Sequence, residues 1–457
     1  MSDGPSDRIA AHVAALDWAA LSASAAQAAK VVLLDAAGVM LGASGLAEEV
    51  RPFIRMAAAM GAGPCTIAGT DQRVSLPMAA LANGALAHAL DYEDAFDKAP
   101  GHPNASLVPA LIALAQGAGP VDGRRFLTAL AVGGDISCRM GLALRRPMEA
   151  GNWYPPPILA AYGAAAGAAS LLGLNAAQVR DALSMTLCQV TMPGEIKYSA
   201  GTVLRAVREA FPAQAAVQCA LLAREGVAGF ETPLEGRAGF YALYAGGEFE
   251  PADLTDRLGE HFWIEHLTFK PWPSCRGTHP FIELALDLRA RHAIDPARIG
   301  RIEVEHDAIQ SMLLEPLARK AAPQVAIDAK FSIPFTAALA LARGRVGLDD
   351  FDAAALADPA VLALAAKVVP LQRPGEGWQA GSGGLMRIVL ADGTVHSAEV
   401  DNALGCPARP LATGALVEKF VACATRAARG ISEVEVRELA EAILTLESCE
   451  DVGALFD

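Results

Sequence analysis

Small apolar residues recur at helical spacing from about Asp7 to Arg257, and this pattern constrains the fold more than any other feature of the chain. Two examples are SASAAQAAKVVLLDAAGVMLG and PPPILAAYGAAAGAASLLGL, each bounded by glycine or proline. Gly173 predicts the end of one such helix, and Asn175 predicts the cap of the next. Small side chains let helices approach closely. With 53% hydrophobic and 19% charged residues, the chain is expected to be mainly α with a large core.

The periodicity changes after Phe269. RIGRIEVEHDAI alternates as a strand does, and LMRIVLADGTVHSAEV predicts a hairpin around Asp392-Gly393. From Thr413 the pattern returns to pure helix. We therefore expect a large all-helical domain with an inserted smaller α+β lid domain, divided as 1–268 for the first helical part, 269–405 for the lid and 406–457 for the helical return.

The bulk properties exclude several classes of function. A formal net charge of −14 argues against nucleic acid or an anionic membrane as partner. The eight cysteines are scattered without metal-ligand spacing, and no phosphate-binding or zinc-protease motif is present. The N-terminus carries acidic residues, and apolar stretches are interrupted before a membrane-spanning length. We expect a cytoplasmic enzyme that would need a local basic pocket for any anionic substrate.

The stretch LDYEDAFDKAPGHPNAS at the end of the apolar segment LPMAALANGALAHAL holds an acidic cluster that is followed by His102. Its carboxylates lie where a buried helix is expected to end, so they must be neutralised, hydrogen-bonded or part of a functional site. They are Asp91, Glu93, Asp94 and Asp97. Asp91 and Asp94 would share a helix face, and His88 has the same spacing from Asp91. Together with His102 they predict a proton-transfer site or a divalent-cation site, or else a cap with a solvated loop.

Three further segments carry candidate residues. EIKYSAGTVLRAVREAF holds Lys197 and the pair Arg205 and Arg208, which either binds an anion or forms the charged face of an amphipathic helix. NWYPPP places Tyr154 in a rigid loop.

FKPWPSCRGTHP combines Lys270, Cys275 and Arg276 before a helix that Thr278 can cap, so it predicts a carboxylate site or a structural elbow. Cys275 lacks a His/Asn pattern that would support a nucleophile. Asn104 or Ser106 can cap the helix after His102, which makes that helix N-terminus favourable for anions.

Taken together, VSLPMAALANGALAHALDYED with GHPNASLVPALIALA, then KPWPSCRGTHP, then AKFSIPFTAALAL and GRVGLDDF resemble the successive motifs of the MmgE/PrpD family. The family includes 2-methylcitrate dehydratase, cis-aconitate decarboxylase and iminodisuccinate epimerase. The resemblance implies an all-helical domain with an α+β lid, usually as a homodimer. It also implies action on small di- and tricarboxylates without metal or organic cofactor.

By this resemblance, Asp91 and His102 correspond to the site aspartate and histidine of decarboxylase members, and Lys270 corresponds to the site lysine. Arg205 stands near the place where many members carry a substrate-binding lysine. The chain departs from many members at Tyr154 and near Cys275, where they carry histidines. A tyrosine can still transfer protons beside a cation such as Lys197, which would suit an epimerase.

We therefore expect a cofactor-independent, metal-free lyase of the dehydratase type. Arg205, Lys270 and Arg276, with Cys275 beside them, would bind substrate carboxylates. His102 would be the main acid/base.

In the same scheme Asp91 is the partner of His102, and Tyr154 is a second acid. The alternatives are an epimerase using Tyr154 with Lys197 or His102, a decarboxylase of an aconitate-like acid, a carboxylate-binding homologue without turnover, and a metal-dependent enzyme using Asp91 and Asp94.

Overall fold

The computed structural model describes residues 4–199, 201–373 and 382–457. These residues form two compact units. Unit 1 comprises residues up to Ala89, Ala99–Leu267 and the C-terminal segment from Ala412, and unit 2 comprises Leu90–Lys98 and Thr268–Leu411. Unit 2 thus includes the segment that carries the acidic cluster. The domain limits at 268/269 and 405/406 stay a prediction, since compact units need not coincide with independently folding domains.

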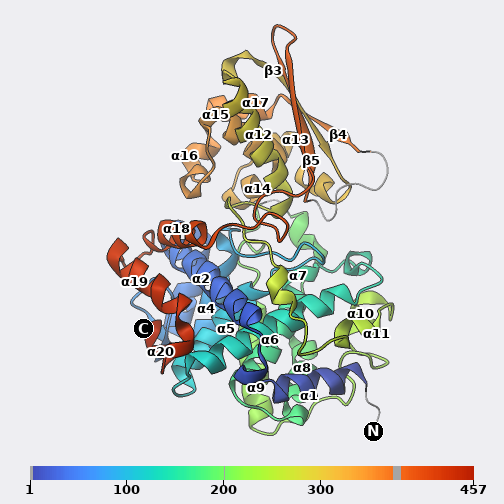
Figure 1. The fold of residues 1–457 in the computed structure, drawn as a ribbon, viewed down its shortest axis with the longest axis vertical. Coiled ribbons are helices and arrows are strands. Elements are labelled where there is room, and N and C mark those ends of the chain that lie inside the picture. Colours follow the sequence, from blue (N-terminus) through green and yellow to red (C-terminus); the bar gives the residue numbers. More distant parts are fainter. Residues whose placement is uncertain (1–3, 200, 374–381) are drawn as a thin grey trace. The chain divides into compact units, whose positions relative to one another are not determined.

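Unit 1 is a bundle of helices with one short hairpin (Figure 1). Its α-helices are α1 (Pro5–Ala15), α2 (Ala23–Leu46), α3 (Arg51–Ala59), α4 (Leu76–Ala89), α5 (Asn104–Gly117), α6 (Gly123–Leu142), α7 (Pro155–Leu171), α8 (Ala176–Gln189), α9 (Ala210–Arg224), α10 (Phe240–Ala245), α11 (Pro251–Thr255), α18 (Thr413–Ala424), α19 (Glu433–Leu444) and α20 (Val452–Leu455). The strands β1 (Ala62–Thr66) and β2 (Arg73–Val74) pair antiparallel.

Small residues allow the helices of this bundle to pack closely, as the sequence predicted. A Cβ atom added to Gly163 of α7 would stand 2.5 Å from the carbonyl oxygen of Gly133 on α6. Only glycine allows two helix backbones to approach this closely. The predicted helix end at Gly173 is confirmed by its left-handed φ of 67°, and Asn175 caps α8 in a capping box.

Helix α2 is longer than the interrupted apolar pattern led us to expect. Its 24 residues are long and apolar enough to cross a membrane by length and composition, but 83% of its most apolar window is buried inside the protein. A buried core helix meets the same criteria of length and composition.

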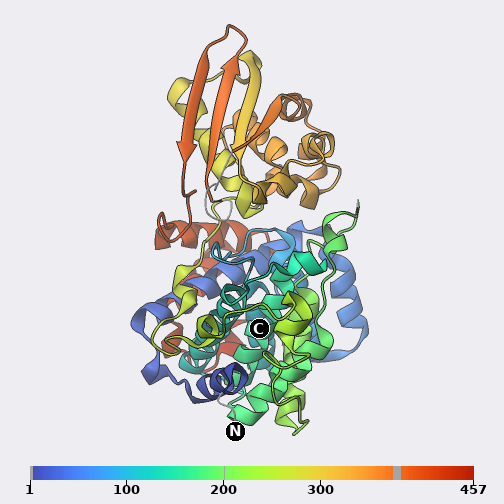
Figure 2. The same ribbon diagram turned by 90° about the vertical axis from the view of Figure 1, so that its right-hand side faces the viewer.

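Unit 2 contains a four-stranded sheet in the order β4-β3-β5-β6 (Figure 2). The strands are β3 (Ile299–His306), β4 (Val368–Gln372), β5 (Gly384–Leu390) and β6 (Val395–Val400), and the helices are α12 (His279–His292), α13 (Leu317–Ala321), α14 (Ala326–Lys330), α15 (Ile333–Arg343), α16 (Ala353–Leu356) and α17 (Pro359–Ala365). β5 and β6 form the predicted hairpin, with Gly393 at a φ of 88° in its turn. Helix α12 packs on β5 and β6. The mainly α fold class with a smaller α+β part is confirmed.

Local expectations fail where helices are shorter than the apolar pattern. Helix α4 ends at Ala89 and Asp91 adopts a left-handed φ of 48°, so Asp91 and Asp94 share no helix face. Likewise Arg205 and Arg208 lie in turns before α9, rather than on an amphipathic helix.

The predicted side-chain caps at two helices are also wrong. Helix α5 begins at Asn104 with Pro103 at its N-cap, and Thr278 uses its hydroxyl to bond the Cys275 carbonyl oxygen. In both cases the residue at the N-cap has helical backbone angles, from which a side chain does not reach the free amides of the first turn.

Candidate active site

Within unit 2, the acidic segment Leu90–Lys98 is held against the segment that begins at Thr268. Ala95 and Thr268 exchange backbone hydrogen bonds of 2.8 Å in both directions. The Tyr92 hydroxyl donates to the carbonyl oxygen of Pro271, at 3.0 Å. The Thr268 hydroxyl donates to Asp97, at 2.7 Å. Two motifs that the sequence analysis treated separately therefore form one network.

The centre of this network is a fully buried ion pair. Lys270 Nζ lies 2.7 Å from Asp91 Oδ1 and 2.9 Å from the Asp91 carbonyl oxygen, and both side chains are 0% exposed. Burial by itself lowers the pKa of Lys270, but the carboxylates of Asp91 and Glu93 outweigh it and the net pKa is raised. Lys270 is thus a cation at neutral pH, and its charge is directed at Asp91.

Arg276 is held by a second, weaker ion pair in the same unit. Its Nε lies 3.2 Å from Asp97 Oδ2, and its Nη2 donates to the carbonyl oxygen of Ala403, at 3.1 Å. In the described part of the chain, its buried Nη1 has no hydrogen-bond partner. The neighbouring Cys275 is partly exposed and forms no disulfide bond. The structure thus places Asp91, Lys270, Cys275 and Arg276 in one region of unit 2.

A second cluster lies in unit 1 around Tyr154, which directly precedes α7. Three cations lie over its ring: Lys197 Nζ at 5.3 Å, Arg205 Cζ at 5.7 Å and Arg208 Cζ at 5.1 Å from the ring centroid. Tyr154, Arg205 and Arg208 are 6%, 7% and 0% exposed. Two buried arginines and a half-buried lysine gathered on one aromatic ring are not an ordinary charged surface. Anion binding here stays a prediction.

Glu209 and Ser106 complete this cluster, and the sequence analysis did not identify them as site residues. Arg208 Nε lies 3.1 Å from Glu209 Oε1, with both side chains 0% exposed. The hydroxyl of Ser106, in the first turn of α5, donates to Glu209 Oε2 at 2.6 Å. The only sequence signal was an adjacent pair of opposite charges, Arg208-Glu209, within an apolar stretch.

His102 lies just before α5, one turn from Ser106. Its ring is 5.3 Å from that of His88 between centroids, at an interplanar angle of 54°. His88 is fully buried on the last turn of α4, whereas His102 is half-buried. Imidazoles exchange protons near neutral pH and also bind transition metals. The pair therefore suits acid/base chemistry, and the expectation of a metal-free site remains to be tested.

A groove of about 220 Å³ borders the Tyr154 cluster and is lined in part by Trp153, Lys197 and Tyr198. Lys197 Nζ also lies 3.7 Å from Glu149 Oε1 at this groove. Solvent can thus reach one of the three cations, while the two arginines are buried.

Comparison with known proteins assigns the chain to a family. The model of the MmgE/PrpD N-terminal domain matches residues 7–252, and that of the C-terminal domain matches residues 272–447. The chain belongs to the MmgE/PrpD family. This membership confirms the resemblance seen in the motifs and supports an enzymatic role.

Several MmgE/PrpD relatives are similar along most of their length. The cis-aconitate decarboxylase-like protein oryM of Aspergillus oryzae is 30% identical over 75% of this chain and 74% of its own. The cis-aconitate decarboxylase of Mus musculus is 26% identical, over 84% and 78%. That of Aspergillus terreus is 25% identical, over 86% and 83%. At such identities the family is shared, while the reaction can differ through a few side chains.

Proposed function

We propose that this MmgE/PrpD protein is a lyase that acts on a small di- or tricarboxylate without a cofactor, by removing a proton next to a carboxylate and then eliminating water. The observation that carries the proposal is the cation cluster on Tyr154. In a chain with a net charge of −14, the half-buried Lys197 and the buried Arg205 and Arg208 form a local cationic cluster. Their three positive charges outnumber the two carboxylates that pair with them, Glu149 and Glu209, so the cluster is expected to bind a carboxylate.

The chemistry follows from what such cations do to a bound carboxylate. The cationic cluster on Tyr154 neutralises the carboxylate, stabilises the negative charge that develops when the adjacent carbon loses its proton, and so lowers the barrier. His102 takes this proton, and the Tyr154 hydroxyl gives its proton to the leaving hydroxyl, which departs as water. Ser106 and Glu209 position Arg208 over the ring. In unit 2, the Asp91–Lys270 pair fixes the acidic segment against the segment that begins at Thr268.

Decarboxylation is the second candidate, because the relatives described above are named as cis-aconitate decarboxylases or as similar to them. The same cations would stabilise the carbanion left when carbon dioxide departs, and Tyr154 or His102 would then protonate it. This chain has Tyr154 where many family members have a histidine, and we place dehydration first because Tyr154 can act as the acid that protonates the leaving hydroxyl. One assay must therefore distinguish the two reactions.

The test is incubation of the purified protein with citrate, 2-methylcitrate, aconitate isomers and iminodisuccinate in deuterated water, followed by NMR, with and without a chelator. Loss of water from a hydroxy acid supports the first candidate, and loss of carbon dioxide supports the second. Deuterium exchange without either loss would indicate the epimerase. Binding without any exchange, or activity that disappears on chelation, would refute the proposal.

We further propose that the chain acts in the cytoplasm as a homodimer. Exposed apolar side chains on unit 1 support association. Met56 on α3 and Met60 just after it are 45% and 69% exposed, and Phe211 on α9 is 48% exposed and contacts Phe53 of α3 edge-to-face. Light scattering should give twice the chain mass of 47.3 kDa, and Phe211→Asp should shift the equilibrium towards monomer. A wild-type monomer at micromolar concentration would contradict this.

A further inference from the structure

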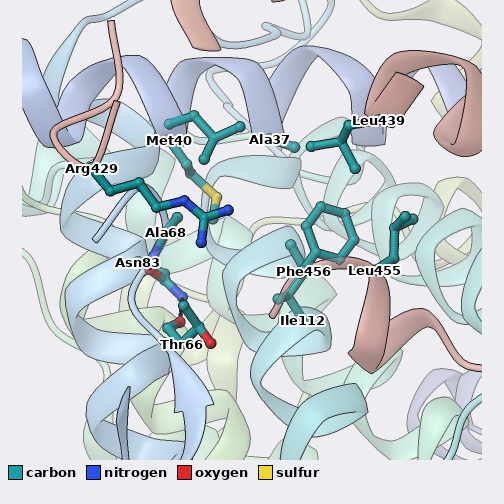
Figure 3. A pocket seen from close by; sticks show the side chains of 12 residues that line it. Ala37, Met40, Thr66, Ala68, Asn83, Ile112, Arg429, Leu439, Leu455 and Phe456 are labelled. Atoms are coloured by element: carbon teal, nitrogen blue, oxygen red, sulfur yellow. Dashed lines mark hydrogen bonds between the residues drawn. The ribbon is translucent and has the colours of Figure 1, made fainter. Parts of the chain in front are cut away.

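A cavity in unit 1 contains none of the residues assigned above. It lies between α2, α4, α5 and the C-terminal segments (Figure 3). Figure 3 shows two sides: Arg429, Asn83 and Thr66 on one, and Leu439, Leu455 and Phe456 on the other. One cavity therefore joins a polar side, with a cation, to an apolar side.

Arg429 is the cation of the polar side, and its backbone is anchored to the wall of the cavity. The Arg429 amide donates to the carbonyl oxygen of Gly69, another lining residue, at 2.9 Å. Within the described residues, Arg429 takes part in no ion pair. Arg429 acts electrostatically on Glu435, whose carboxylate accepts hydrogen bonds from the backbone and side chain of Ser432. The guanidinium is thus available to a ligand at the rim of the cavity.

A buried donor lies on the same side. Thr66 is 6% exposed, and its Oγ1 has no hydrogen-bond partner in the part of the chain that the structure describes. Asn83 bonds other atoms instead: its Oδ1 accepts from the Ala68 amide, and its Nδ2 donates to the Thr66 carbonyl oxygen. A buried hydroxyl without a partner costs stability unless a ligand satisfies it.

The size and lining of the cavity restrict its occupant. About 30 Å³ is open to atom centres, against roughly 10–15 Å³ for one water. This space takes the carboxylate end of a small ligand and is too small for a tricarboxylate. A short alkyl chain would extend from it along the half-exposed Leu455 and Phe456. Ile112, Leu455 and Phe456 would contact an alkyl end, while Arg429 and Thr66 would contact an anionic end with two oxygens.

We propose that this cavity is an accessory site for a short-chain monocarboxylate of about three or four carbons. One carboxylate oxygen pairs with the Arg429 guanidinium and the other accepts the Thr66 hydroxyl. The alkyl chain lies against Phe456 and Leu455. Binding joins α20 to the turn after α18 and to β1, so the ligand stabilises unit 1. The site is independent of the lyase proposed above.

Saturation-transfer NMR with n-butyrate on the intact chain tests the site, with n-butanol as the uncharged counterpart. A ligand this small should bind at a dissociation constant on the order of 1 mM. Butanol should bind at least tenfold more weakly, because it lacks the charge that Arg429 recognises. A rise in melting temperature with butyrate should accompany binding.

Three variants make the assignment specific. Arg429→Gln should weaken butyrate binding at least tenfold, while Arg237→Gln, at an exposed arginine of the same unit, should leave it unchanged. Leu439→Trp, at the half-buried rim, should obstruct the cavity without disturbing the core. Thr66→Val should weaken binding while leaving the melting temperature of the ligand-free protein equal or higher, since it removes a hydroxyl without a partner.

Several outcomes would overturn the proposal. Butyrate binding that survives Arg429→Gln, that falls equally with Arg237→Gln, or that butanol reproduces would each do so. Loss of binding on Arg205→Gln with retention on Arg429→Gln would assign butyrate to the Tyr154 cluster instead. If neither butyrate nor propionate binds, the cavity is no carboxylate site, whatever the panel assay shows about the lyase.

Discussion

Lys270→Met removes the cation from the buried pair at the centre of unit 2. The ammonium lies 2.7 Å from Asp91 Oδ1, and both side chains are 0% exposed. The same ammonium stabilises Glu93, which is also 0% exposed. After the substitution, Asp91 loses the cation that pairs with it and Glu93 loses a favourable charge. Breaking a buried pair from one side typically costs about 3–5 kcal/mol, a large fraction of the roughly 5–15 kcal/mol that stabilises a domain.

Asp91→Asn should cost less, about 1–3 kcal/mol. The amide oxygen can still accept a hydrogen bond from Lys270, and Glu93 still provides a negative charge nearby. The double variant Asp91→Asn/Lys270→Met should be less destabilised than Lys270→Met alone, because it leaves one fewer carboxylate without its cation. The order of the three variants therefore follows from the geometry and does not depend on the absolute magnitudes.

Urea unfolding of the three variants, followed by circular dichroism, gives the free energies of unfolding. The raised pKa of Lys270 determines how its contribution to the free energy of unfolding depends on pH. This contribution is complete below about 10.5, the pKa of the lysine in the unfolded chain, and is lost as pH rises through the higher pKa of the folded state. The difference between wild type and Lys270→Met should thus be flat from about pH 6 to 9. A cost below about 1 kcal/mol for Lys270→Met, or a larger cost for Asp91→Asn, would refute the reasoning.

Three further predictions concern unit 1. Ser106→Ala removes the 2.6 Å hydrogen bond to Glu209 and should lower the free energy of unfolding by about 1.5–3 kcal/mol. Gly84→Ala places a Cβ 2.6 Å from the Glu209 carbonyl oxygen, so it should separate α4 from α9 and cost about 1–3 kcal/mol by urea unfolding. Burial, and then Arg139, lowers the pKa of His12 to about 4. As pH falls, His12 takes up a proton in the unfolded chain before it does so in the folded protein. The free energy of unfolding should therefore fall by about 3 kcal/mol between about pH 6.5 and pH 4. His12→Phe should flatten this pH profile.

The elements that the sequence predicted well are those in which local pattern and tertiary packing agree. The β5–β6 hairpin follows from alternation and an Asp-Gly turn, and α8 follows from the capping residue Asn175. The end of α4 was misplaced because the apolar pattern continues to Leu90, while Asp91 leaves the helix with a left-handed backbone. The hydrogen bonds between Asp91 and Lys270 stabilise the end of the helix at this point. Helix propensity along the sequence cannot predict such a distant contact.

The candidate site was predictable in part. The sequence analysis placed a cation such as Lys197 beside Tyr154, and the structure brings Lys197 and Arg205 onto its ring. The buried partners Ser106 and Glu209 were not predicted as site residues. The contacts that define the two clusters join residues far apart, 179 positions for Lys270 and Asp91 and 103 positions for Ser106 and Glu209. Such pairs depend on the tertiary fold, so periodicity and spacing cannot reveal them.

The most direct measurement of the central claim, that the cations on Tyr154 bind the reacting carboxylate, is kcat/KM of Arg205→Gln on the acid that the panel identifies. Loss of a buried cation that binds a substrate anion should reduce kcat/KM by about 30-fold or more. Arg205→Lys should recover part of this loss because it restores the charge, and Arg237→Gln should equal wild type. A kcat/KM for Arg205→Gln within about threefold of wild type would contradict the account.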